Sequence, residues 1–194
     1  ECLDSCRLRS KVLDVYPNTI YRLLNSQEEE NIAVIDMGRR GINITITENR
    51  SFYLHSVLQI NMELILESCR KDHEIDVEEF NSKYLYNEFD FEGINSDRGA
   101  AKKDLEAALY GMLRQTSMNL DYYNSRHFGK AVDRILVIGE YGMLKGLKEI
   151  MERSYRTDVT IGMKPVRHME NKNNDSFKAA QMGYYSLLGM VLRG

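Results

Sequence analysis

The sequence contains no long apolar run and no dense cluster of basic residues. None of its apolar stretches approaches the roughly 20 residues that a membrane-spanning helix needs. No Lys/Arg run is denser than a pair such as Arg39-Arg40 and the formal net charge is -3, so a nucleic-acid partner is not expected. No secretory signal is visible either. Because the first residue is Glu1 rather than Met, we expect the chain to be part of a longer protein.

Cysteine is also sparse. Cys2, Cys6 and Cys69 form an odd set, which indicates a reducing compartment rather than a disulfide framework. Cys2 and Cys6 could share one helix face, but two thiols without nearby ligands do not make a zinc site, which usually takes about four. The histidines are scattered, and no Ser-His-Asp or Cys-His pattern stands out, although a spatial triad stays open. The sequence therefore offers no catalytic base that can be placed.

The chain does contain one organising stretch, Ala33–Thr47, which predicts a strand, a tight turn and a second strand. It begins with an apolar run that carries Asp36 near its end, and then turns at Gly38–Gly41. Asn43–Thr47 alternates polar and apolar residues, as a half-buried strand does. Phe52–His55 follows a second turn. We therefore expect a three-stranded antiparallel meander.

Other segments follow helix or strand periods. The strongest helix pattern is Ala100–Arg126, whose Met and Tyr residues we expect to fill the core. Short connections and mixed strand types predict a single α/β domain with helices on the sheet. The remaining expected helices begin near Pro17 and cover 56–71, 76–85, 142–155 and 175–191, and the remaining expected strands are Lys11–Val15, Asp133–Ile138 and Asp158–Ile161.

Two glycine-containing turns, Gly38–Gly41 and Gly139–Gly146, each follow a buried strand. If those strands are parallel neighbours, both turns face one crevice, where open α/β sheets bind ligands. Backbone N–H groups around Gly38 would then point at phosphate, and Asp36 would hold a metal ion through water. Asp36 could equally accept hydrogen bonds from its own turn, and Gly139 could simply lead into a helix.

Four segments resemble the second half of an actin-like ATPase of the Hsp70/actin/sugar-kinase superfamily, and most closely the PilM-like type IV pilus assembly family, whose relatives include FtsA. Val12–Leu24 resembles the strand and helix that enter the second domain. Ala33–Ile46 is similar to the second phosphate loop, and Asp133–Leu147 to the adenosine motif. Gly189–Gly194 resembles the ending of PilM-like chains.

This resemblance implies an actin-like (RNase H-like) subdomain, with a mixed five-stranded sheet, a three-strand antiparallel meander and flanking helices. Residues 1–30 would end the preceding actin-like domain and form the crossover helix. Residues 31–194 would form the second domain, with a helix-plus-loop excursion at 72–99. The family's first phosphate loop would lie upstream of this chain.

The resemblance also implies a nucleotide site, and the sequence departs from the family there. Arg39 and Arg40 replace small or hydroxyl residues; they could grip phosphate or an acidic partner, or form a solvated turn. Glu140 and Tyr141 replace small residues, and a carboxylate there would repel a polyphosphate. If the site is functional, its implied nucleotide-binding residues are Asp36, Gly38, Arg39, Arg40, Gly139, Glu140 and Gly142, with Asp36 also holding Mg²⁺ through water.

We therefore expect ATP and Mg²⁺, if they bind at all, to do so in the full-length protein. This chain itself is expected neither to hold a cofactor nor to hydrolyse ATP. The leading hypothesis is a cytoplasmic scaffold at the inner face of the cell membrane. PilM-like proteins dock the N-terminal segment of the membrane protein PilN, largely through their first domain, and work with other pilus assembly proteins; self-association is a further expectation.

Two alternatives stay open. Asp36, Gly38 and Gly139 support an actin-fold ATPase or a small-molecule kinase. The second alternative is an FtsA-like cell-division protein. FtsA ends in a membrane-binding helix after a linker, and the sequence to Gly194 contains neither.

Overall fold

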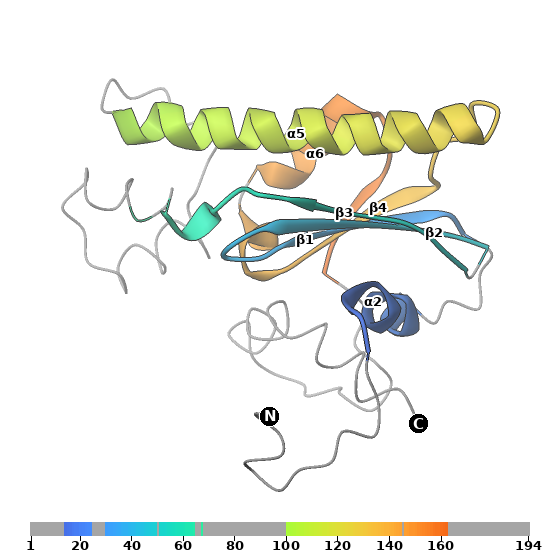
Figure 1. The fold of residues 1–194 in the computed structure, drawn as a ribbon. Coiled ribbons are helices and arrows are strands. Elements are labelled where there is room, and N and C mark those ends of the chain that lie inside the picture. The colour runs from blue at the N-terminus through green and yellow to red at the C-terminus, as the bar shows by residue number, and fades with distance from the viewer. Residues whose placement is uncertain are drawn as a thin grey trace, which may run out of the picture.

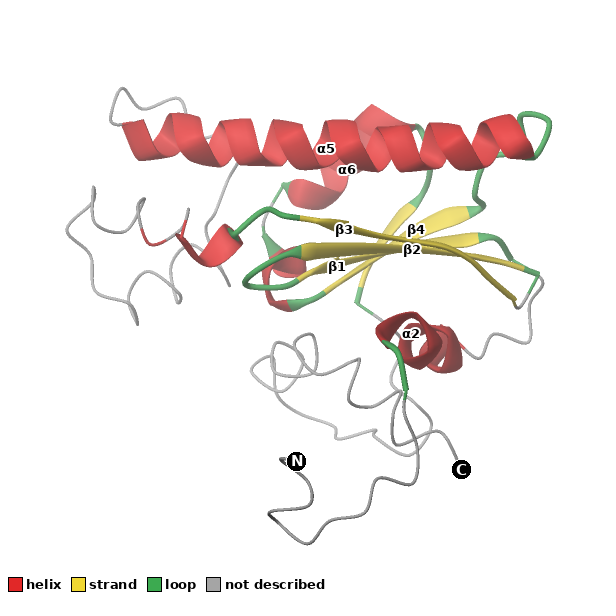
Figure 2. Ribbon diagram, viewed as in Figure 1, coloured by secondary structure: helices red, strands yellow, loops and turns green. Residues whose placement is uncertain are grey.

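The computed structural model describes residues 14–24, 30–49, 51–64, 67, 100–144 and 146–162, with only the backbone for 100–106. These residues form a five-stranded mixed sheet with helices on both faces (Figures 1 and 2). The strand order is β3-β2-β1-β4-β5. The predicted α/β class and the mixed five-stranded sheet are confirmed.

The predicted meander is present as β1 (Ile32–Met37), β2 (Ile42–Glu48) and β3 (Ser51–Leu58), paired antiparallel in chain order. However, β2 is not half-buried. Thr45 and Thr47 are buried as well as the isoleucines, and the Thr47 hydroxyl donates to the carbonyl oxygen of Ile32 at 3.3 Å. The expectation was wrong because a helix covers this polar face too.

β4 (Arg134–Ile138) and β5 (Val159–Ile161) extend the sheet on the other side of β1. β4 runs parallel to β1, with Asp36 opposite Ile138, and β5 runs parallel to β4. The apolar run of β4 is buried on both faces, as predicted. The carboxyl ends of β1 and β4 therefore lie side by side.

The helix α5 (Ala100–Arg126) lies across one face of the sheet together with α6 (Leu147–Tyr155) (Figure 1). The predicted bounds of α5 are confirmed. The expectation that its Met and Tyr residues fill the core holds for Met112 and Tyr123 but is wrong for Tyr110, Met118 and Tyr122, which are exposed. Its buried residues recur at three- and four-residue steps, as a core face requires, and are Leu109, Met112, Leu113, Thr116, Leu120 and Tyr123.

The helix α2 (Tyr16–Leu24) covers the opposite face (Figure 2). Ile20 and Leu23 pack in a smaller apolar cluster with Val34 and Ile138 of the sheet. The helix near Pro17 is thus confirmed. Of the strand expected just before it, residues 14 and 15 form no strand, and residues 11–13 lie outside the described residues.

Two helix predictions were wrong at their starts. Residues 56–58 end β3, with Leu58 paired to Ile42, and the helical turn after them is Met62–Leu64. The helix expected from Gly142 begins only at Leu147, because Gly146 adopts a left-handed backbone (φ 80°). Before it lies a short 3₁₀ turn, η2 (Glu140–Met143).

Several predictions fall outside the described residues: the helices at 76–85 and 175–191, the excursion at 72–99, the three cysteines and the segment 189–194. Within the part of the chain that the structure describes, no helix has both the length and the apolarity needed to cross a membrane.

Candidate functional site

The two glycine-containing turns meet at one corner of the sheet. Gly139 follows β4 directly and lies against the end of β1. A Cβ atom built on Gly139 would lie 2.3 Å from Asp36 Oδ1 and 2.6 Å from the Met37 nitrogen. Its backbone (φ 92°, ψ 163°) is also one that only glycine adopts readily. The close approach of the two turns therefore depends on glycine at this position.

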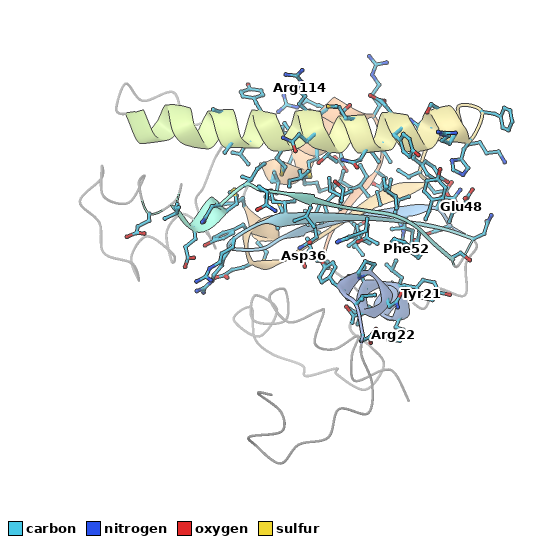
Figure 3. The ribbon with its side chains drawn as sticks, viewed as in Figure 1. Tyr21, Arg22, Asp36, Glu48, Phe52 and Arg114 are labelled. Atoms are coloured by element: carbon cyan, nitrogen blue, oxygen red, sulfur yellow. The ribbon has the colours of Figure 1, made fainter. Side chains whose placement is uncertain are left out.

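The carboxylate of Asp36 is already bound by the chain. The hydroxyl of Tyr16, the first residue of α2, donates a hydrogen bond to Asp36 Oδ2. Burial raises the pKa of Asp36, and this hydrogen bond offsets only part of the rise. Burial and the nearby Asp36 charge raise the pKa of Tyr16 far above its ordinary range, so its hydroxyl keeps the proton that it donates. Figure 3 shows Asp36 on the α2 side of the sheet.

Two further polar side chains, those of His55 and Thr45, lie near Tyr16 on the face of the sheet that α2 covers. The ring of His55 lies 5.5 Å from the Tyr16 ring, and His55 Nδ1 lies 3.1 Å from Thr45 Oγ1. Burial lowers the pKa of His55. This cluster was not predicted from the sequence, although pairing the meander strands places Thr45 directly opposite His55.

A bidentate ion pair joins the two turns. Arg39 Nε donates to Glu140 Oε2 at 2.6 Å, and Arg39 Nη2 donates to Glu140 Oε1 at 2.9 Å. Hydrogen bonding to Glu140 raises the pKa of Arg39 above its already high value, so the guanidinium stays charged. Two residues that depart from the family pattern are thus each other's partners.

A second carboxylate holds the hairpin tip. Glu63 Oε1 lies 3.8 Å from Arg39 Nη1, and Glu63 Oε2 lies 3.9 Å from Arg40 Nε. The Glu63 N–H also donates to the carbonyl oxygen of Arg39 at 3.0 Å. Arg40 is largely exposed, as a solvated turn residue would be, whereas Arg39 is bound by two carboxylates.

The turns use backbone donors that a phosphate would need. The Gly38 N–H donates to the carbonyl oxygen of Gly41 at 3.2 Å, which closes the hairpin. The Gly142 N–H donates to the carbonyl oxygen of Gly139 at 3.1 Å, within η2, where Gly142 is buried. The Gly38 N–H, which was expected to point at phosphate, is thus bonded within the hairpin in this structure. Among the described residues, no group of three or more His, Cys, Asp or Glu side chains could hold a metal ion.

No protein-family model and no curated protein matches this sequence. Solved structures do resemble it. Over 98% of this chain and 55% of the other, it is similar to a chain of the "PilM-PilN type IV pilus biogenesis complex", with a TM-score of 0.70 and 14% identity. The ethanolamine utilization protein EutJ from Carboxydothermus hydrogenoformans matches with a TM-score of 0.57 and 14% identity, over 99% of this chain and 58% of that one.

An archaeal actin homolog, Ta0583 in complex with ADP, matches with a TM-score of 0.54 and 16% identity, over 89% of this chain and 53% of that one. The chain has an actin-like ATPase fold. At these identities the likeness shows the fold alone, and the chain spans slightly more than half the length of the structures it matches.

In this actin-like fold the described residues do not fit a magnesium nucleotide as they are arranged. Asp36 is bound by Tyr16, and Arg39 is bound by Glu140. A polyphosphate placed between the two turns would meet the Glu140 carboxylate, and it could bind Arg39 only by breaking the ion pair. The corner is therefore stabilised by its own side chains.

Proposed function

We propose that this chain belongs to an actin-like scaffold that works through protein contacts, with a degenerate nucleotide site. The bidentate Arg39–Glu140 pair carries this proposal. Arg39, in the turn that resembles a phosphate loop, is already paired with Glu140, in the turn that resembles an adenosine loop. In this proposal residues 1–30 complete a preceding actin-like domain and residues 31–194 form the second one, with 72–99 as an excursion.

The partner we propose is the N-terminal segment of a PilN-like membrane protein, docked at the cytoplasmic face of a type IV pilus inner-membrane platform. The structural likeness to a chain of the PilM-PilN complex supports this choice among actin-like proteins. The net charge of -3 argues against nucleic acid as a partner. Other pilus assembly proteins and further copies of the scaffold complete the proposed assembly.

Electrostatic repulsion between Glu140 and a bound phosphate favours the scaffold over a nucleotide-binding enzyme. Two like charges about 4 Å apart repel by about 1 kcal/mol in bulk water and by about 4 kcal/mol at the effective dielectric typical of pairs near a protein surface, and the solvent at this partly exposed corner places the repulsion toward the lower value. A phosphate beside Glu140 would meet such a repulsion unless the carboxylate moved away, and moving it would leave Arg39 with only the distant Glu63 carboxylate. Both the repulsion by Glu140 and the loss of its pairing with Arg39 weaken nucleotide binding.

Calorimetric titration of the full-length protein with ATP and Mg²⁺ tests the degenerate site. We expect no saturable heat from the wild type. The Glu140→Ala variant should bind more tightly than the wild type, since it removes the repulsion and frees Arg39. Saturable binding by the wild type that is lost in Asp36→Ala would contradict the proposal, provided that both proteins are folded.

The partner is tested separately. A synthetic peptide with the sequence of a PilN-type N-terminal segment should be retained by the immobilised full-length protein, and a scrambled peptide should not. If no such peptide binds, the pilus role is wrong even where the nucleotide site is degenerate.

An actin-fold ATPase or small-molecule kinase is the second candidate. The observation that favours it is the corner itself, since Asp36 and Gly139 lie in contact distance at the carboxyl ends of parallel strands. Phosphate release by the full-length protein that is lost in Asp36→Ala would support this candidate. Absence of release from the intact protein would remove it.

A further inference from the structure

One face of α5 points away from the sheet and carries a regular row of large side chains. The row repeats every four residues, so neighbouring members are adjacent on the surface, but each is turned about 40° from the last and the row winds across the outer face of the helix. We call it the α5 stripe; its residues are Tyr110, Arg114, Met118, Tyr122 and Arg126. Figure 3 shows Arg114 on the side of α5 that faces away from the sheet.

The apolar members of the α5 stripe are unusually exposed. The relative exposure is 70% for Tyr110, 61% for Met118 and 48% for Tyr122, whereas Met112 and Tyr123 of the same helix are fully buried. Tyr, Met and Arg are enriched at the centres of protein interfaces. Covering these apolar side chains would remove apolar surface from water and so favour an association.

Phe128 lies just beyond the stripe, in the turn that ends α5. Its side chain is completely exposed, and its backbone is left-handed with φ 55°. This backbone closes the helix, because the Gly129 N–H donates to the carbonyl oxygen of Asn124 at 2.9 Å, as in a C-terminal cap with a left-handed residue. The exposed ring is of a type enriched in protein interfaces.

The charges of this surface identify the partner's chemistry. In the described structure neither Arg114 nor Arg126 lies within salt-bridge distance of a carboxylate, and the Arg126 guanidinium lies 5.5 Å from the centroid of the Tyr122 ring. Over residues 107–130 the described charges are Arg114, Arg126 and Lys130 against Asp121. This surface is positive on a chain whose net charge is -3.

We propose that the α5 stripe docks an acidic amphipathic helix of a partner protein. Arg114 and Arg126 lie about 18 Å apart along the axis, since a helix rises about 1.5 Å per residue. Met118 and Tyr122 lie between them. The matching partner presents carboxylates at both ends of an apolar segment about three turns long, packed at a shallow angle to α5. This surface is separate from the nucleotide corner, and its test does not depend on the proposed function.

A second copy of this chain is disfavoured in two arrangements. In a parallel pair each arginine would face itself, and in an antiparallel pair centred on Leu120 Arg114 would face Arg126, so like charges oppose association. An antiparallel pair centred on Met118 would instead place the arginines against tyrosines, and sedimentation velocity tests that occupant. An anionic membrane is a poor occupant, because membrane-binding surfaces usually carry about 4–8 basic residues in a cluster.

The experiment selects random helical peptides by display on the full-length protein. Counter-selection uses the Tyr110→Ser/Met118→Ser/Tyr122→Ser variant, which changes only exposed residues. Recovered peptides are synthesised and titrated against the wild type, against Arg114→Glu/Arg126→Glu, and against each of its two single reversals. Arg153→Glu on α6 is the charge-matched control for those single reversals. Circular dichroism verifies that every variant is folded.

We expect acidic peptides with central aromatic or aliphatic residues. Their dissociation constant should rise by about tenfold or more in Arg114→Glu/Arg126→Glu, and should change less than about twofold in Arg153→Glu. Three outcomes would overturn the proposal: enrichment of no peptide or of basic ones, equal loss of binding in both charge variants, or stripe-dependent binding to vesicles of 70% phosphatidylcholine and 30% phosphatidylglycerol instead. Stripe-dependent dimerisation in sedimentation velocity would assign the surface to a second copy and would equally reject it.

Discussion

At the corner formed by β1 and β4, ionisable side chains are bound by groups of the same chain, whereas the apolar and aromatic side chains of the α5 stripe are exposed. Asp36 accepts from Tyr16, and Arg39 makes a two-bond pair with Glu140. On α5, by contrast, Tyr110 and Met118 remain mostly exposed. The corner lies at the carboxyl ends of parallel strands, where open α/β sheets bind ligands, yet its groups support the fold itself.

This difference predicts where substitutions act. A group that is bound within the chain contributes to the free energy of unfolding when it is removed, and an exposed group contributes little. Variants at the corner should therefore lower stability, while variants of the α5 stripe should lower only the affinity for a partner. Each experiment below tests one side of that contrast, from the largest expected change in stability to the smallest.

Gly139→Ala should cause the largest loss. The new Cβ would lie 2.3 Å from Asp36 Oδ1 and 2.6–2.7 Å from Met37 backbone atoms, so β1 and β4 must separate. Overpacking and an unfavourable backbone together should lower the free energy of unfolding by about 3 kcal/mol or more. Urea denaturation followed by circular dichroism measures the change.

Two other glycines separate the effect of overpacking from that of the unfavourable backbone. Gly129 has a positive φ of 82° with open space around it, so Gly129→Ala should cost only about 1 kcal/mol. Gly111 lies within α5 with no atom near its missing Cβ, so Gly111→Ala should stabilise the protein by about 0.5–1 kcal/mol. Equal effects of Gly139→Ala and Gly129→Ala would show that the corner is not tightly packed.

Tyr16→Phe should cause the next largest loss, because it leaves the half-buried Asp36 carboxylate without its donor. We expect the free energy of unfolding to fall by about 1.5–3 kcal/mol, the range for hydrogen bonds to charged groups. The matched control is Tyr155→Phe, whose hydroxyl donates to the neutral carbonyl of Leu113 at 3.2 Å and should contribute about 0.5–1.5 kcal/mol. A larger effect at Tyr155 would contradict the role given to the pair.

The pH dependence of stability should identify Asp36 directly. Burial raises the folded-state pKa of Asp36, so between the ordinary carboxyl pKa of about 4 and the raised one the folded state binds more protons than the unfolded state. The wild type should therefore lose stability relative to Asp36→Asn as pH rises through that window. His55 is present in both proteins, so its own titration largely cancels in the difference. If the wild type instead became more stable relative to Asp36→Asn as pH rises, burial would not raise the pKa of Asp36 and the prediction would be wrong.

Local patterns predicted most of the fold. The continuous apolar run of β4 and the helical spacing of Ala100–Arg126 each have a short-range physical cause, and each was confirmed, whereas the alternation of β2 predicted a strand correctly but not its burial on both faces. The wrong prediction of helix at residues 56–58 also has a short-range cause. Val57, Ile60 and Leu64 are spaced as on a helix, but Val57 is an exposed residue of β3, whose length is set by pairing with β2.

The candidate site was predicted only in outline. The two turns were expected to meet if their strands were parallel neighbours, and they do meet. The contacts that decide their chemistry were not predictable, because Arg39 and Glu140 are 101 residues apart and nothing in either segment encodes the other. The same holds for Tyr16 and Asp36. Side-chain pairing across a sheet depends on the assembled topology rather than on local pattern.

A double-mutant cycle of Arg39→Ala and Glu140→Ala should show a small coupling. Although the pair is bidentate, Arg39 remains 59% exposed, so solvent screens the attraction. We expect a coupling free energy of about 0.2–1 kcal/mol in urea denaturation. Coupling well above that range would mean that the pair holds the fold, and coupling of zero at low salt would mean that the two turns are not joined in solution.

The smallest changes in stability should occur on the α5 stripe. Tyr110→Ser and Met118→Ser remove exposed side chains, so each should alter the free energy of unfolding by no more than about 0.5 kcal/mol. Met112→Ala, on the opposite face of the same helix, should cost about 2–5 kcal/mol because it leaves a cavity against the sheet. If Tyr110→Ser destabilised the protein nearly as much as Met112→Ala, the stripe would be part of the fold, and its exposed aromatic and Met side chains would no longer need a partner to explain them.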